Sequence, residues 1–164
     1  RAAIHMARRH FGLLRSCRGL RIVLRSAEAY LDAATADDVF DAILVDTTEP
    51  ISNGHVGGLS APHRALCRRR AVRRLLSRLS RGGVLLINVL GDDLSVTRLQ
   101  RVVAGALSGG HVLHRIVCSD EGNVVLAVVD EARIVGPGTL RPPPAGWREA
   151  CASVGLRVVE DANH

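Results

Sequence analysis

The sequence has no lysine, few aromatic side chains and no long hydrophobic run. Aromatic residues make up 2% of the 164 residues and hydrophobic residues 47%, so a core has to be built from leucine, valine, alanine and isoleucine. That composition suits parallel strands covered by helices. No apolar stretch approaches the roughly 18–20 residues that cross a bilayer, so we expect no membrane partner.

The cysteines and histidines also lack the spacings of metal sites. No CxxC occurs, and the four cysteines lie far apart, at Cys17, Cys67, Cys118 and Cys151. We interpret them as reduced core thiols of a cytoplasmic protein. His111 and His114 are three residues apart in a predicted strand, so they face opposite sides and cannot share a metal ion. We therefore expect no metal.

All 22 basic side chains are arginine, and the net charge is +6. The loss of lysine beside abundant alanine, glycine and valine indicates a GC-rich coding bias, because charge alone gives only non-specific attraction to nucleic acid. One predicted helix carries arginines off its apolar stripe, namely Arg69, Arg70, Arg73, Arg74 and Arg78. We expect a solvated outer face there. Binding of nucleic acid or of an acidic protein is the alternative.

Hydrophobic periodicity predicts helices and strands in alternation. Helices are predicted over 1–12, from Ser26 onward, over 62–80 and over 94–107, and strands over 20–25, 40–46, 84–90, 111–118 and 123–129. This order predicts an α/β fold of the Rossmann-like, doubly wound kind, with a mostly parallel sheet and a C-terminal antiparallel hairpin. Residues 136–164 are predicted to form a Pro/Gly-rich loop and a helix–strand extension.

The stretch FDAILVDTTEP, residues 40–50, is the strongest candidate for a site. Its strand is apolar nearly throughout, which predicts burial on both faces. Ligands of doubly wound sheets bind beyond the carboxyl ends of the strands, which is where Asp46 stands. Asp46 suits either a hydrogen-bond acceptor for an amine or a general base, and Glu49 is close enough to share the site. The structural alternative is that both acids cap a turn.

Three further features of the sequence are either ambiguous between a functional and a structural role or are better explained by a structural one. Asn88, at a predicted strand end, is either a site residue or a turn residue. Gly54, Gly57 and Gly58 favour a flexible lid over a phosphate loop, because no GxGxxG and no lysine accompany them. Asp92 and Asp93 are predicted to cap the helix that begins at Leu94.

The segments VLRSAEAYL, FDAILVDTTEP and RGGVLLINVL together resemble the spermidine-synthase-like branch of the class I S-adenosylmethionine-dependent methyltransferases. GLSAPHRAL, RGGVLLINVLGDD and EGNVVLAVV carry a narrower resemblance, to the C-terminal domain of the eukaryotic elongation factor 1-alpha dual methyltransferases, which act on a lysine and an N-terminus. The matches reach from about residue 3 to 130. They imply that residues 1–135 form a partial methyltransferase-like domain with strands three to seven of that fold.

The resemblance also implies chemistry. Asp46 corresponds to the acid that deprotonates the amine, and Glu49 to the acid that holds it. Ser26, Ala27, Asp46 and Thr47 are the implied contacts of S-adenosylmethionine. The implied activity is methyl transfer to a protein amine, with a translation elongation factor as the implied partner. The alternatives are a polyamine aminopropyltransferase and a non-catalytic remnant that serves as a binding module.

The sequence departs from the family at its start. The glycine-rich cofactor loop after the first strand and the acid that ends the second strand are both absent, so we expect the chain to begin after them and to be inactive on its own. The family orders its strands three, two, one, four, five, seven, six. Unpaired buried backbone is costly, so either the strand at 20–25 docks beside the strand at 40–46 or a second chain fills the gap.

Overall fold

The computed structural model describes residues 2–10, 21–35, 37–48, 58–118, 122–130 and 156–159, and the chain divides into two units. The first unit, Arg1–Ala33, contains helices α1 (Ala2–His10) and α2 (Ala27–Ala33). The hydroxyl of Ser26 accepts a hydrogen bond of 3.2 Å from the backbone N–H of Ala29. Ser26 therefore caps α2, as the sequence predicts.

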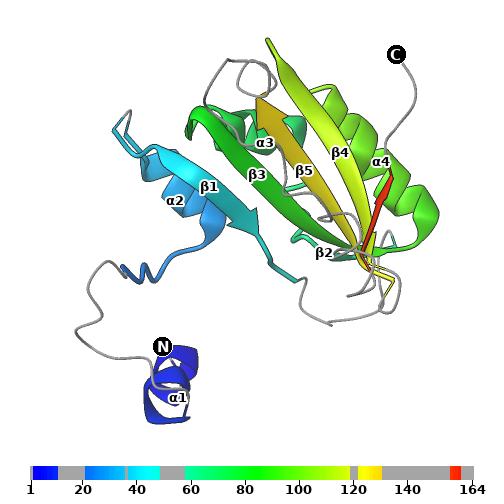
Figure 1. The fold of residues 1–164 in the computed structure, drawn as a ribbon. Coiled ribbons are helices and arrows are strands. Elements are labelled where there is room, and N and C mark those ends of the chain that lie inside the picture. The colour runs from blue at the N-terminus through cyan, green and yellow to red at the C-terminus, as the bar shows by residue number, and fades with distance from the viewer. Residues whose placement is uncertain are drawn as a thin grey trace, which may run out of the picture. The chain divides into compact units, whose positions relative to one another are not determined.

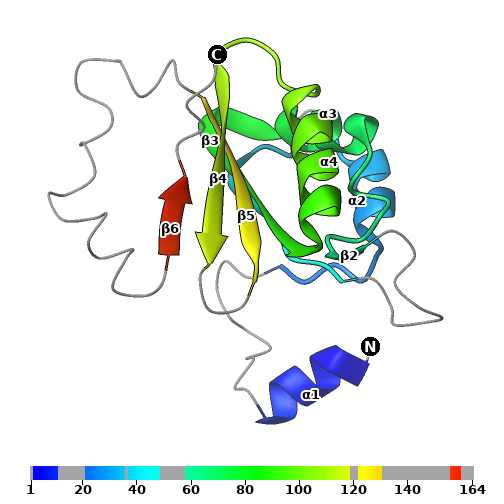
Figure 2. The same cartoon turned by 90° about the vertical axis from the view of Figure 1, so that its right-hand side faces the viewer.

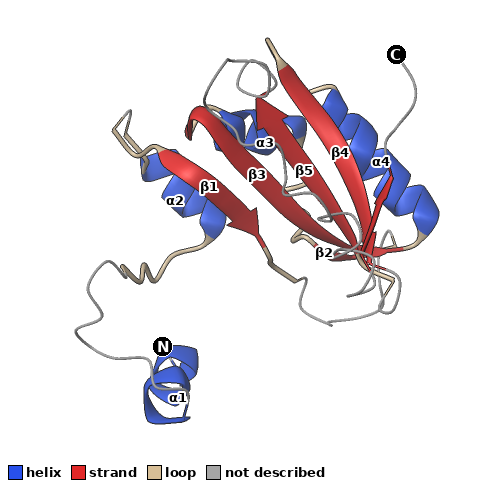
Figure 3. Ribbon diagram, viewed as in Figure 1, coloured by secondary structure: helices blue, strands red, loops and turns tan. Residues whose placement is uncertain are grey.

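The second unit, Ala34–His164, is built on one sheet (Figure 1). Its strands are β1 (Phe40–Val45), β2 (Leu59–Ala61), β3 (Leu79–Gly91), β4 (His111–Cys118), β5 (Val124–Asp130) and β6 (Leu156–Val159). Helices α3 (Arg69–Leu76) and α4 (Asp93–Ala104) flank β3 in the chain. The strand order is β1-β3-β5-β4-β6, with β2 paired to the end of β3 (Figure 3).

The pairing confirms the predicted α/β, Rossmann-like class and its antiparallel hairpin, formed by β4 and β5. The order β1-β3-β5-β4 is also that predicted for strands four, five, seven and six. The share of parallel pairing is smaller than expected. Among the described strands β1 and β3 run parallel, whereas the pairs β2–β3, β3–β5, β4–β5 and β4–β6 are antiparallel.

Helices α3 and α4 cover one face of the sheet (Figure 2). Under them, alternate residues of β3 are buried, as the period of two in a strand requires. The helices contribute their own apolar stripes. The sequence predicts a stripe of Val72, Leu75, Leu76 and Leu79 for α3, and the first three lie in it, whereas Leu79 begins β3. The buried side chains are Leu85, Ile87 and Val89 of β3, Val72, Leu75 and Leu76 of α3, and Val96, Leu99 and Val103 of α4.

The prediction that the strand at 40–46 is buried on both faces is wrong. Leu44 is 70% exposed, and Ala42 is exposed as well. Leu44 pairs with Leu86, which points away from the face that carries Leu85 and Ile87. β1 is also the edge strand, and α3 and α4 do not cover the side of the sheet on which Leu44 lies, so that side of β1 is exposed.

The predicted strand at 20–25 is also wrong for its described part. Residues 21–25 form no strand, and Ile22 and Leu24 are exposed. A short apolar run becomes a strand only where another strand takes its backbone hydrogen bonds. Among the described strands β1 pairs with β3 alone, so docking of residues 21–25 as a strand on β1 is not seen. A second chain at this edge stays a prediction.

Two helix predictions need correction at their ends. The helix expected from residue 62 begins at Arg69, because β2 and a turn occupy residues 59–67, and it ends at Leu76, since residues 79–91 form β3. The helix expected over 94–107 is Asp93–Ala104, and Leu94 is 62% exposed, whereas Ser95 and Val96 are buried. The cap at Asp92 sets the first turn of α4 and with it the buried face.

Of the extension predicted over residues 136–164, the structure describes only one part. The strand expected in LRVVE is present as β6, whereas the loop at 136–146 and the helix after it lie outside the described residues. In the part of the chain that the structure describes, every helix is too short or too polar to cross a membrane.

Candidate functional site

The site begins where the parallel strands β1 and β3 bring their residues to the same level. Val45 is paired with Ile87, so the next residues, Asp46 and Asn88, stand side by side. Nδ2 of Asn88 donates a hydrogen bond of 3.0 Å to Oδ1 of Asp46. Asn88 lies within β3, which continues to Gly91, so the turn interpretation of Asn88 is wrong. Its role as a site residue stays a prediction.

This hydrogen bond orients the Asp46 carboxylate. Asn88 is paired with Val125 of β5, and the residue before it, Ile87, is paired with Val45 of β1, so the backbone that carries the amide donor is held on both sides. Asp46 is exposed, and no described residue forms a hydrogen bond with its second oxygen, Oδ2. The arrangement therefore presents one carboxylate oxygen to solvent at the carboxyl end of β1, where a cation or an N–H donor can bind it.

Thr47 ties the segment after β1 to a turn from elsewhere in the chain. Its Oγ1 accepts a hydrogen bond of 3.0 Å from the backbone N–H of His63. The preceding Ala61–Pro62 peptide is cis, and Pro62 is fully buried. Sγ of Cys67 lies 3.5 Å from the carbonyl oxygen of Pro62 and 3.7 Å from that of His63. These contacts fix the direction in which the chain leaves Asp46.

Gly58, the described member of the predicted glycine-rich loop, packs against an acid. Its φ is +74°, and a β-carbon there would lie 1.7 Å from Oδ2 of Asp92. A carboxylate so close to this backbone repels an anion, which argues against a phosphate loop at Gly58. Gly54 and Gly57 lie outside the described residues.

Asp92 acts in the structure as the predicted helix cap. Its Oδ1 accepts a hydrogen bond of 2.8 Å from the backbone N–H of Ser95, and the Ser95 hydroxyl lies 3.1 Å from Oδ2. The two hydrogen bonds with Ser95, with a smaller effect of the Arg98 charge, lower the pKa of Asp92 from its usual value of 3.8. Asp92 therefore stabilises the start of α4.

The other predicted site residues are not brought together by any described contact. Ser26 and Ala27 begin α2 in the first unit, whereas Asp46 and Thr47 belong to the second unit. Glu49 lies outside the described residues. Among the residues that the structure describes, no three His, Cys, Asp or Glu side chains gather as a metal site. The cofactor contacts and the role of Glu49 stay predictions.

Sequence reasoning missed one partner of the site, His63, and left the role of another, Asn88, open. The backbone N–H of His63 has no sequence signal, because any residue except proline supplies one. Asn88 has a signal, since it is a polar residue between Ile87 and Val89 in a strand that is otherwise apolar. A lone amide in a buried strand predicts a hydrogen-bonding partner at the same level of the neighbouring strand.

Comparison with known proteins identifies the fold. No family model and no curated protein matches the chain. Among solved structures, the chain is similar to the crystal structure of human methyltransferase-like protein 13 in complex with SAH, with a TM-score of 0.63 and 18% sequence identity. The similarity covers 98% of this chain and 71% of that one. At this identity the likeness shows a methyltransferase-like, Rossmann-like fold.

Proposed function

We propose that the chain is part of an S-adenosylmethionine-dependent methyltransferase that acts on a protein amine, either a lysine or an N-terminus. One observation carries the proposal: at the carboxyl end of β1, the Asp46 carboxylate is fixed by Asn88 and presents its other oxygen. The fold supports it, because the similar solved protein is methyltransferase-like and was crystallised with SAH.

The chemistry of nitrogen methylation explains the need for a carboxylate. A lysine amine has a pKa near 10.4, so at neutral pH it is protonated and lacks the lone pair that attacks a methyl group. Asp46 binds the ammonium group through Oδ2 and lies where it can accept a proton. When bound, S-adenosylmethionine supplies the electrophilic methyl group.

One of the residues implied to contact the cofactor keeps a donor for it. Ser26 uses its oxygen as an acceptor in the helix cap, so its hydroxyl proton remains for an adenine nitrogen. A glycine-rich loop of the GxGxxG kind, which lets the backbone approach the cofactor, occurs nowhere in the 164 residues. We therefore expect the isolated chain to show no measurable heat of S-adenosylmethionine binding by calorimetry. Micromolar binding would contradict this part of the proposal.

A transfer assay tests the function. The longest product of the gene that contains this chain is incubated with methyl-labelled S-adenosylmethionine and elongation factor, and separately with decarboxylated S-adenosylmethionine and putrescine. The proposal expects label on a protein amine. Aminopropyl transfer to putrescine would favour the polyamine alternative, and an inactive product would favour the non-catalytic binding module.

Asn88→Ala tests whether Asn88 is a positioning residue. Loss of the amide lets the Asp46 carboxylate rotate, so we expect kcat to fall about ten- to a hundredfold with little change in the melting temperature. Asn88→Asp should lower kcat further, because a second carboxylate would face the first. The transfer assay and a thermal melt measure the two effects. A fall in melting temperature with unchanged kcat would show that Asn88 has only a structural role.

A further inference from the structure

Positive charge is concentrated in one part of the chain. Residues 58–106, which contain α3 and α4, carry ten arginines and two acids, whereas the rest of the chain carries twelve arginines and fourteen acids. The net charge of +6 therefore arises from residues 58–106, a segment that is called the helical layer below although it also contains β2 and β3. A coding bias toward arginine explains the choice of arginine over lysine, but it does not explain the near absence of acids from one layer.

The arginines of this layer lie on its outer surface. The inner surface is occupied by the apolar stripes of α3 and α4, so the charged residues face solvent. Eight of the ten are exposed, namely Arg64, Arg68, Arg69, Arg70 and Arg73 before or in α3, Arg81 in β3, and Arg98 and Arg101 on α4. The guanidinium carbon of Arg69 lies 3.8 Å from the place that a β-carbon of Gly105 would take, so it reaches the end of α4.

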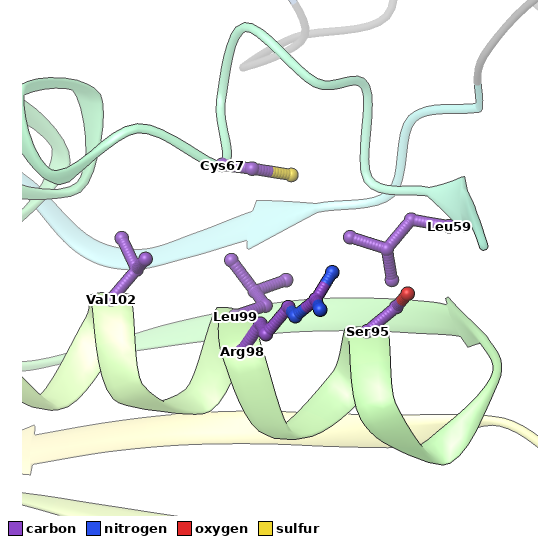
Figure 4. A pocket seen from close by; sticks show the side chains of 6 residues that line it. All are labelled: Leu59, Cys67, Ser95, Arg98, Leu99 and Val102. Carbon is purple, nitrogen blue, oxygen red and sulfur yellow. The ribbon is translucent and has the colours of Figure 1, made fainter. Parts of the chain in front are cut away.

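A small pocket is lined by one of these arginines, Arg98. It has a volume of about 150 Å³ and lies between α4 and the turn that leads into α3. Figure 4 shows Arg98 rising from α4 toward the space between Cys67 and Leu59. The lining is mostly apolar, with Leu59, Cys67, Leu99 and Val102 beside Ser95 and Arg98.

The two acids of the layer leave much of its charge uncompensated. Asp92 accepts hydrogen bonds from Ser95 and lies in the field of Arg98, whose charge contributes to its lowered pKa. Oδ1 of Asp93 lies 3.8 Å from a guanidinium nitrogen, Nη2, of Arg115 in β4. Both acids stand at the first turn of α4, whereas Arg101 and Arg69 stand toward its other end.

We propose that this pocket and the arginines around it form a docking site for an acidic segment of a partner protein. An aliphatic side chain of the segment enters the pocket, and its carboxylates pair with Arg98 and Arg101. Guanidinium groups bind carboxylates through two parallel hydrogen bonds, which gives such pairing its specificity. A protein fits better than nucleic acid, because the apolar pocket has no aromatic lining on which a base could stack.

The docking site is joined to the candidate site through one turn. Cys67 lines the pocket, and its sulfur lies against the carbonyl groups of Pro62 and His63. The His63 N–H in turn binds Thr47, which follows Asp46. The inference that the docked partner is also the protein that is methylated rests on the proposed function. Docking itself requires neither cofactor nor catalysis, so a binding assay separates the two proposals.

Fluorescence anisotropy with a labelled peptide of glutamate and aspartate around one central leucine tests the docking site. The double variant Arg98→Glu/Arg101→Glu should weaken binding about tenfold or more, since it turns two attractive pairs into repulsive ones. The matched control, Arg21→Glu/Arg25→Glu, makes the same charge change at exposed residues of the first unit. It should change the affinity by less than about twofold at physiological salt.

Val102→Trp tests the pocket without a change in charge. The indole should fill it, so binding of the leucine peptide should weaken to that of a peptide with serine in place of leucine. Thermal melts confirm that each variant is folded. Equal losses in the two charge-reversal variants, or a Val102→Trp variant that binds the leucine peptide as well as wild type, would overturn the proposal. Tighter binding of single-stranded RNA than of the peptide, insensitive to Val102→Trp, would instead assign the surface to nucleic acid.

Discussion

Asp46→Asn is expected to lower the rate of methyl transfer by about 10²–10⁴-fold, the range in which general-base catalysis contributes. The amide has nearly the shape of the carboxylate, and its oxygen can still accept the hydrogen bond from Asn88. It cannot take a proton from an ammonium group or balance its charge. The fold should therefore survive while the transfer is lost, which the labelled transfer assay and a thermal melt measure together.

Asp41→Asn is the matched control for this variant. Asp41 lies on the same strand, near its other end, where Oδ1 accepts a hydrogen bond of 2.6 Å from the Ser80 hydroxyl. The same chemical change there should leave the transfer rate within about twofold of wild type, because surface substitutions away from a site have small effects. If both variants lose activity equally, or if Asp46→Asn keeps its rate, Asp46 is not the acceptor of the amine proton.

Leu85→Ala is expected to reduce the free energy of unfolding by about 2–5 kcal/mol. Leu85 is fully buried, on the face of β3 that α3 and α4 cover, and it pairs with Val128 on β5. Removing its methyl groups leaves a cavity that the paired strands on either side cannot close. Urea unfolding followed by circular dichroism measures the loss.

Leu44→Ala makes the same change on the uncovered side of the sheet. Leu44 is 70% exposed, so its truncation should cost no more than about 0.5 kcal/mol. Comparable losses in the two variants would contradict the one-sided core, because they would mean that Leu44 is buried to a similar extent.

The sequence predicts those elements of this fold that depend on local pattern. Val72, Leu75 and Leu76, three of the four residues of the predicted stripe, form the inner face of α3, because residues three and four apart share a side of a helix. The fourth, Leu79, begins β3. Asp92 predicts the start of α4 through its capping hydrogen bond. The hairpin of β4 and β5 follows from two apolar runs separated by a short turn.

Features that depend on distant contacts could not be predicted in this way. An apolar strand such as β1 has the same sequence pattern whether one face or both faces are covered, so the exposure of Leu44 needed the position of the helices. The run at 21–25 has a strand-like pattern, but a strand requires a neighbour. Within the site, Asp46 was predicted from its place after a strand. Its contact with Asn88 depends on the register between β1 and β3.

Binding of an amine at Asp46 is the claim on which the proposed function depends most directly. Titration of the isotopically labelled chain with N-acetyl-lysine amide, followed by NMR, measures it without any cofactor. The account predicts chemical-shift changes centred on Asp46, Thr47 and Asn88 that are absent from the Asp46→Asn variant. Shift changes centred elsewhere, or changes that persist unaltered in that variant, would contradict it.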